Sequence, residues 1–93
     1  MTEFAFHSEE IPFVTQDTKE ILDFLRNLYA KIPQKEIDGL SVEHPKWRFN
    51  VRTSNTEPLL RLNVEARTQA DMEHVRDDLI VFLQKRGAVL KVQ

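Results

Sequence analysis

Two stretches of alternating apolar and polar residues, separated by a short polar segment, constrain the fold of this chain most. Trp47, Phe49 and Val51 recur at every second position with Thr53 next on the same face, and the alternation resumes from Leu59 to Ala66. Side chains of a β-strand point alternately to its two faces, so each stretch predicts a strand with one buried face. The intervening segment, residues 53–58, predicts a hairpin connection longer than a minimal turn. The chain is therefore expected to contain an antiparallel pair of half-buried strands.

Apolar residues at helical spacing predict two helices outside this hairpin. The first helix is expected to begin after an N-cap at Asp17, with Glu20 in the capping-box position, and to end at Pro33. The second is expected to begin after Thr68 and to end at Gly87, because glycine is common just past helix C-termini. Each helix has one apolar stripe, so each is expected to pack that side against the sheet.

Two shorter strands are predicted beside the hairpin. Residues 11–14 predict a strand at an edge of the sheet, because Pro12 has no N–H to donate to a second neighbour. Residues 40–43 predict another strand, which follows a turn at Asp38-Gly39. The predicted fold class is therefore α+β, with an antiparallel sheet of about four strands and two helices packed on one face.

The length of the chain, 93 residues, predicts a single domain over residues 1–93. Residues 1–8 are expected to form either a short strand or a disordered lead-in. Residues 89–92 are expected to form a last strand or a packed tail.

Composition limits the classes of partner. The chain has 13 basic and 15 acidic residues, a formal net charge of −2, whereas nucleic-acid binders are usually basic. No apolar run approaches the ~18 residues that span a bilayer. We therefore predict neither a nucleic-acid nor a membrane partner. The absence of cysteine fits a reducing compartment, which predicts a cytoplasmic location.

No catalytic residue and no metal site are predicted in the chain. Its three histidines, His7, His44 and His74, are widely separated and lack metal-ligand spacing. With only two glycines, the chain cannot contain a glycine-rich phosphate loop. No serine or threonine lies in a local signature of an activated nucleophile.

The polar segment of the hairpin is nevertheless suited to an oxyanion. Arg52 offers a planar fork for two phosphate oxygens, and Ser54, Asn55 and Thr56 can donate to the others together with loop N–H groups. The same residue types are ordinary in turns, so composition alone leaves a phosphate site and a plain turn both open.

Three neighbours, Thr53, Glu57 and Arg61, are predicted to support this segment. Glu57 would repel a phosphate, so we expect it to turn away and to pair with a basic neighbour such as Arg61 or Arg48. Arg61 lies on the polar face of its strand, where it is either a surface charge or a support for the loop.

These residues resemble a known family. The match is to the C-terminal domain (domain 4) of the α-D-phosphohexomutase superfamily, and the Ser-Asn-Thr version of the loop is most similar to phosphomannomutase/phosphoglucomutase enzymes. The resemblance is carried by Asp38-Gly39-Leu40, Trp47 through Val51, Arg52-Thr-Ser-Asn-Thr-Glu-Pro58, Leu60, Arg61 and Glu65-Ala66. It extends from about Ser8 to the C-terminus. The family often has Ser-Gly-Glu-Ile where this chain has Ser8-Glu9-Glu10-Ile11.

The resemblance implies a fold like that of the TATA-box-binding protein and one role within a larger enzyme. Such mutases have four domains and interconvert 6-phospho and 1-phospho hexoses, using a phosphoserine in the first domain and magnesium in the second. Their fourth domain holds the non-transferred phosphate and closes over the substrate. Carried over to this chain, the phosphate ligands would be Arg52, Ser54, Asn55 and Thr56. The implied partners are a hexose phosphate and the other domains of the parent enzyme.

A chain of this length lacks the phosphoserine loop and the magnesium-binding aspartates of such enzymes. We therefore expect a domain cut from a longer enzyme, inactive alone, with a stand-alone protein as the other option. A function of a different class, a small ferredoxin-like interaction or regulatory module without a phosphate ligand, is the alternative.

Overall fold

The computed structural model describes residues 4–36, 39–53 and 57–91, which form a seven-stranded antiparallel sheet and two helices. The elements, in chain order, are β1 (Phe6–His7), β2 (Ile11–Val14), α1 (Thr18–Leu28), β3 (Gln34–Lys35), β4 (Gly39–Glu43), β5 (Trp47–Thr53), β6 (Leu59–Ala66), α2 (Gln69–Lys85) and β7 (Val89–Leu90).

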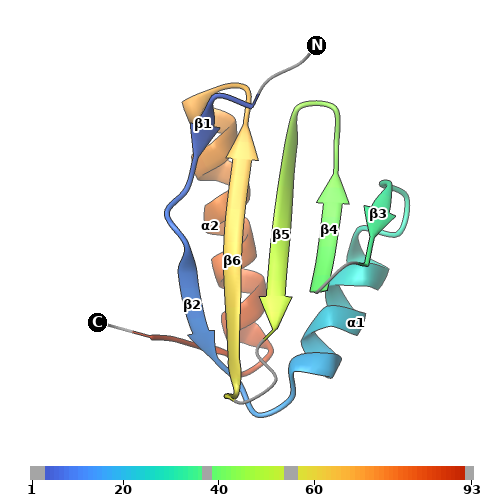
Figure 1. Ribbon diagram of the computed structural model, residues 1–93, viewed down its shortest axis with the longest axis vertical. Coiled ribbons are helices and arrows are strands. Elements are labelled where there is room, and N and C mark those ends of the chain that lie inside the picture. Colours follow the sequence, from blue (N-terminus) through green and yellow to red (C-terminus); the bar gives the residue numbers. More distant parts are fainter. Residues whose placement is uncertain (1–3, 37–38, 54–56, 92–93) are drawn as a thin grey trace.

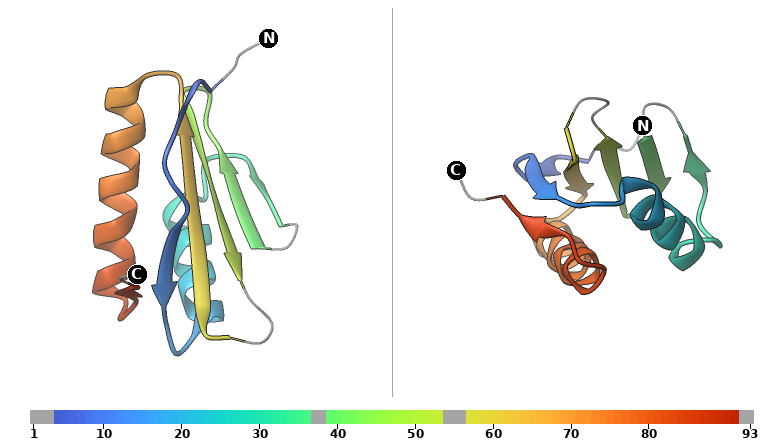
Figure 2. Two further views of the ribbon diagram at one scale, coloured as in Figure 1. Left: turned by 60° about the vertical axis from the view of Figure 1, so that its left-hand side comes forward. Right: turned by 90° about the horizontal axis from the view of Figure 1, so that it is seen from below.

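The sheet is ordered β3-β4-β5-β6-β2-β7, and β1 pairs with the far end of β6, in line with β2 (Figure 1). The predicted hairpin of β5 and β6 is confirmed, with a register from Trp47 opposite Ala66 to Thr53 opposite Leu60. Both helices cover the same face of the sheet, so the other face is open (Figure 2). The predicted α+β class, with both helices on one face, is therefore confirmed.

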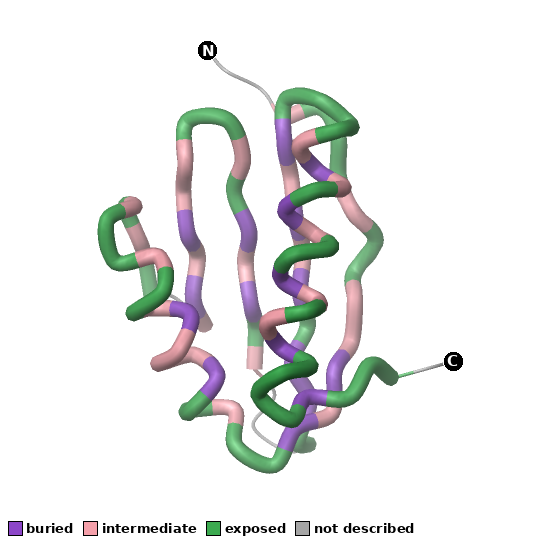
Figure 3. Tube along the Cα trace, turned by 180° about the vertical axis from the view of Figure 1, so that it is seen from behind, coloured by how far each residue is buried: buried purple, intermediate pink, exposed green. Residues whose placement is uncertain are grey.

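The core lies between the helices and the covered face of the sheet. Buried positions recur along the central strands and along both helices (Figure 3). The alternation seen in the sequence explains this layer, because every second residue of β5 and β6 points into it. The largest fully buried side chains are Phe13, Phe49, Ile21, Leu25, Leu40, Leu60, Leu62, Leu79, Leu83, Val42, Val51 and Val64.

The strand count exceeds the prediction of about four because three pairs of residues, β1, β3 and β7, add short strands. Of the two expectations for residues 1–8, the short strand holds for Phe6–His7. The expectation that Ile11–Val14 is an edge strand is wrong, because Phe13 and Val14 pair with β7 on their outer side. Pro12 is compatible with this position because its carbonyl oxygen accepts a bond from the Lys91 N–H (2.9 Å).

The first helix ends at Leu28 rather than at Pro33. The side-chain amide of Gln34 donates to the backbone carbonyl oxygens of Arg26 (3.0 Å) and Tyr29 (2.8 Å). The Tyr29 carbonyl oxygen also accepts from the Ile32 N–H (3.0 Å), so the chain leaves the helix in a turn before Pro33 and enters β3 directly after it.

Both predicted N-caps are confirmed. Asp17 Oδ1 accepts from the Glu20 N–H (3.0 Å), and Thr68 Oγ1 accepts from the Asp71 N–H (3.1 Å). The capping box is incomplete at α1, because the Asp17 N–H donates to Thr15 Oγ1 (3.4 Å) instead of to Glu20. Over the described ranges, neither helix has the length and apolarity needed to cross a membrane.

Candidate anion-binding site on the open face of the sheet

The open face of the sheet carries polar side chains in rows, because residues directly opposite in neighbouring strands point to the same face. The row next to the β5–β6 connection is Gly39, Arg52, Arg61 and Pro12, on β4, β5, β6 and β2. The middle row is Ser41, Asn50 and Asn63, and the far row is Glu43, Arg48 and Glu65. We call Arg52 and Arg61 the basic end of this face, and Arg48, Glu65 and His7 its paired end.

The basic end places two positive charges side by side. Arg52 and Arg61 are directly opposite in the β5–β6 ladder, and both are exposed. Such partners have Cβ atoms about 5 Å apart, and like charges in this arrangement destabilise a sheet. Arg61 has a carboxylate near it, with Nη1 3.6 Å from Glu10 Oε1. An anion bound between the two guanidinium groups would remove their repulsion.

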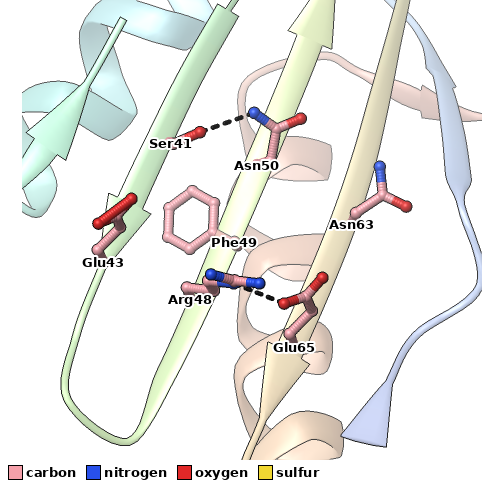
Figure 4. Close-up of a pocket in the computed structure, with 7 residues that line it drawn as sticks. All are labelled: Ser41, Glu43, Arg48, Phe49, Asn50, Asn63 and Glu65. Carbon is pink, nitrogen blue, oxygen red and sulfur yellow. Dashed lines mark hydrogen bonds and ion pairs between the residues drawn. The ribbon is translucent and has the colours of Figure 1, made fainter. Parts of the chain in front are cut away.

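The paired end has its charges neutralised. Arg48 Nε donates to Glu65 Oε2 (2.5 Å), and His7 Nδ1 lies 3.3 Å from Glu65 Oε1. A shallow pocket of about 240 Å³ lies between this end and the middle row. Figure 4 shows the residues that line it. A phosphate entering it would have to separate Arg48 from Glu65. The pocket is therefore less suited to an anion than the basic end.

The predicted phosphate segment is held at both of its described ends. Thr53 pairs with Leu60 at the end of β5, and the Pro58 carbonyl oxygen accepts from the Thr15 N–H (3.0 Å). Thr15 is buried, at 5% exposure, so this bond ties the start of β6 to the connection that leads into α1. The β5–β6 connection therefore begins and ends at fixed points of the sheet, close to Arg52.

Three of the four predicted phosphate ligands, Ser54, Asn55 and Thr56, lie outside the described residues. The fourth, Arg52, lies where the sequence places it, exposed at the end of β5 on the open face. Thr53 is half-buried, alternates onto the covered side and pairs with Leu60; its supporting role stays a prediction.

The expected pairing of Glu57 with Arg61 or Arg48 is wrong. Arg61 lies against Glu10 and Arg48 against Glu65, both of which are nearer on the open face. Glu10 lies in the break between β1 and β2, residues 8–10. Sequence reasoning missed its pairing with Arg61 because no local pattern predicts where this break places its side chain. Glu57 is exposed, and its carbonyl oxygen accepts from the Leu59 N–H (2.8 Å).

Gly39 is a further residue whose role the sequence analysis missed. It lies opposite Arg52 with a φ of +138°, and a Cβ added there would collide with the Val51 carbonyl oxygen. The glycine therefore permits the close approach of β4 to β5 and leaves the space beside Arg52 without a side chain. The sequence did contain a signal for this close approach, namely a glycine directly before the strand predicted over residues 40–43.

The magnesium implied by the family resemblance has no ligand set in the part of the chain that the structure describes. No group of three or more histidine, cysteine, aspartate or glutamate residues comes together there to hold a metal ion.

A sequence model of the phosphoglucomutase/phosphomannomutase C-terminal domain matches residues 10–81. The chain belongs to this family. The match includes the basic end, Arg48 and Glu65 of the paired end, the β5–β6 connection and Glu10.

Relatives of the family extend the match over most of the chain. A phosphomannomutase of Methanocaldococcus jannaschii is 37% identical over 84 residues, which are 90% of this chain and 19% of the relative. A phosphomannomutase of Escherichia coli is 52% identical over 48 residues, 52% of this chain and 10% of the relative. The chain thus spans a fifth or less of the length of these curated relatives.

A solved structure of the family confirms the fold. A crystal structure of a phosphoglucomutase/phosphomannomutase family protein from Burkholderia thailandensis superposes with a TM-score of 0.70 and 30% sequence identity. The superposition covers 95% of this chain and 19% of that protein. The described fold is therefore that of one domain in the larger proteins of this family.

Proposed function

We propose that this chain is the phosphate-binding C-terminal domain of an enzyme that interconverts hexose 6-phosphates and hexose 1-phosphates. The observation that carries the proposal is the pair of exposed arginines at the basic end, set opposite each other beside the β5–β6 connection. Membership of the phosphoglucomutase/phosphomannomutase family supports it, because the substrates of such enzymes carry a phosphate.

The role of the site is to hold the phosphate that is not transferred. Arg52 presents two N–H groups to two phosphate oxygens, and Arg61 adds a second positive charge from the neighbouring strand. Ser54, Asn55, Thr56 and the N–H groups of the connection are the predicted further donors. Anchoring one end of the substrate contributes to catalysis by fixing the orientation of the other end, without making or breaking a bond.

The site is open to solvent, so binding is expected to be weak in this chain alone and stronger when other domains complete it. Phosphate binding would then favour a closed arrangement of the parent enzyme. The phosphoryl carrier, the metal and the sugar-recognising residues would belong to the rest of the parent, so this chain alone is expected to be inactive.

The proposal is tested by titrating the chain with mannose 6-phosphate and with inorganic phosphate while its backbone amide resonances are followed by NMR. We expect saturable shifts confined to residues 52–57 and to the neighbourhood of Arg61. Mannose without phosphate is the matched control and should cause none of these shifts. Scattered shifts, or no shifts at tens of millimolar phosphate, would favour the ferredoxin-like interaction module instead.

A further inference from the structure

We propose that Glu10 competes with bound phosphate for Arg61 and thereby sets the affinity of the basic end. This inference rests on the proposed function of that end. Glu10 acts through Arg61 and is therefore a positioning residue. Glu10 contacts Arg61 through an ion pair in which Glu10 Oε1 lies 3.6 Å from Arg61 Nη1.

The position of Glu10 is fixed by Ser8, in the break between β1 and β2. The Ser8 N–H donates to the Val64 carbonyl oxygen (2.7 Å), and Ser8 Oγ accepts from the Val64 N–H (2.9 Å). Ser8 Oγ also donates to the Glu9 carbonyl oxygen (2.9 Å). These bonds anchor the backbone of the break to β6, so the carboxylate of Glu10 is carried to the open face at a defined place.

The place of Glu10 decides the direction in which it pulls Arg61. The β2–β6 register pairs Pro12 with Arg61 and ends at Ile11 opposite Leu62. Glu10 comes one residue before Ile11, which places it nearer to the paired end than Arg61 is. Arg52 lies on β5, on the side of β6 opposite to β2. The ion pair therefore draws the guanidinium group of Arg61 away from Arg52 and away from the β5–β6 connection.

This pair is suited to exchange its partner. Its side chains are 51% and 45% exposed, and its 3.6 Å separation is longer than a good charge-assisted hydrogen bond. Exposed pairs of this kind are weak, so a doubly charged phosphate can displace the carboxylate. Once displaced, the Glu10 carboxylate faces the anion without its partner. Competition for Arg61 thus keeps the affinity low and favours release of the phosphate.

The experiment measures the dissociation constant of inorganic phosphate for four forms of the full chain by NMR titration at low ionic strength: the natural sequence, Glu10→Gln, Arg61→Met and the double variant. We expect Glu10→Gln to tighten binding about two- to fivefold, the size expected for removal of one unit charge near the anion. The gain should fall well below this in the Arg61→Met background. The Arg61 Nε–H resonance should also move when Glu10→Gln is introduced without phosphate.

Glu65→Gln is the matched control, because it removes the same charge from the ion pair at the other end of the same face. We expect it to leave the phosphate affinity read from the amides of Arg52 and Arg61 within error of that of the natural sequence. A Glu10→Gln gain no larger than that of Glu65→Gln overturns the inference, and so does an equal gain with and without Arg61. Both outcomes leave the proposed function intact, whereas failure of the natural sequence to bind phosphate removes the proposed function and this inference together.

Discussion

The two ends of the open face contain similar residues but differ in how their charges are matched. At the paired end, one carboxylate, Glu65, lies between Arg48 and His7. At the basic end, Arg52 and Arg61 lie opposite each other, and the carboxylate of Glu10 lies against Arg61 alone at 3.6 Å. Placement in the ladder, and not the number of arginines, therefore decides how the charges at each end are matched.

The two ends also differ in the residues that lie next to their charged side chains. Beneath the paired end, Tyr29 of the α1 C-terminus packs edge-to-face on Trp47 and Phe49 of β5, with ring centroids 5.8 and 5.1 Å apart. At the basic end, Gly39 lies next to Arg52 and admits no side chain. Aromatic packing thus lies beneath the paired end, whereas at the basic end a glycine permits a close approach of β4 to β5.

The largest expected effect is on the backbone of the basic end. Gly39→Ala should lower the free energy of unfolding by about 3 kcal/mol, because it combines a collision with the Val51 carbonyl oxygen and a strained positive φ. Urea unfolding measures the change. Gly87→Ala is the control, since it has a φ of +90° but no atom within 4 Å of the added Cβ. Equal costs at the two glycines would show that close strand approach is unimportant.

The next largest effect is on phosphate binding, and it should differ between Arg52 and Arg48, the two arginines of β5. Arg52→Ala should weaken phosphate binding about 30-fold, or raise the KM of the parent enzyme by that factor, which corresponds to about 2 kcal/mol of charge-assisted hydrogen bonding. Arg52→Lys should restore only part of the loss, because lysine lacks the planar fork.

Arg48→Ala removes the same charge from the paired end and provides the control for Arg52→Ala. It lies four residues away on the same face of β5, roughly 13 Å along the strand. Phosphate titrations should be unaffected by it. If the two substitutions weakened binding equally, the basic end would not be the site.

A smaller effect is expected at the break that positions Glu10. Ser8→Ala leaves the Val64 N–H without its side-chain acceptor and should lower the free energy of unfolding by about 1 kcal/mol. Hydrogen exchange of the Val64 amide should accelerate at the same time. Ser41→Ala, on the open face of β4, is a comparison substitution in which only a side-chain bond to Asn50 is lost (2.8 Å). Unchanged exchange at Val64 would mean that Ser8 does not anchor the break.

The smallest expected effect is a loss of stability at high pH through ionisation of Tyr29, which packs beneath the paired end. Burial, with a smaller contribution from Asp78, raises the pKa of Tyr29 to about 12 from its ordinary value of 10.0. Below pH 10 the phenol is protonated in both states, and its contribution to stability is fully present. Between pH 10 and 12 the unfolded chain releases the proton first, so stability falls by roughly 1 kcal/mol or less for this partly exposed group.

Tyr29→Phe should lack this loss. Urea unfolding of both proteins at pH 9.5 and pH 11.5 isolates the difference, because lysine titration affects both proteins alike. Identical pH dependence would show that the Tyr29 hydroxyl is not in a desolvated site.

Much of the fold could be predicted because its signals are local. The alternation from Trp47 to Ala66 predicts the central hairpin and its buried face, and side-chain caps at Asp17 and Thr68 predict where both helices begin. The end of α1 could not be predicted in this way, because the amide of Gln34 folds back onto its last carbonyls. The two-residue strands depend on partners that are distant in sequence, so no local pattern marks them.

The candidate site was predictable only in part. The motif around Arg52 identifies the family, and the family match confirms it. The roles of Ser54, Asn55 and Thr56 as phosphate ligands stay predictions, as does the cytoplasmic location. The counter-charge at Glu10 has no sequence signal, because 51 residues separate it from Arg61 and only the β2–β6 register joins them.

The sequence by itself determined the layered fold class, the hairpin and the presence of an arginine at its polar turn, because periodicity and capping act over a few neighbouring residues. Only the tertiary structure decided which charges meet. Pairing of β5 with β6 set Arg52 against Arg61, and pairing of β1 and β2 with β6 brought His7 to Glu65 and the carboxylate of Glu10 to Arg61. The physical reason is that the electrostatic potential at one place on a sheet depends on charges from several neighbouring strands. The register of those strands is fixed by packing of the whole core.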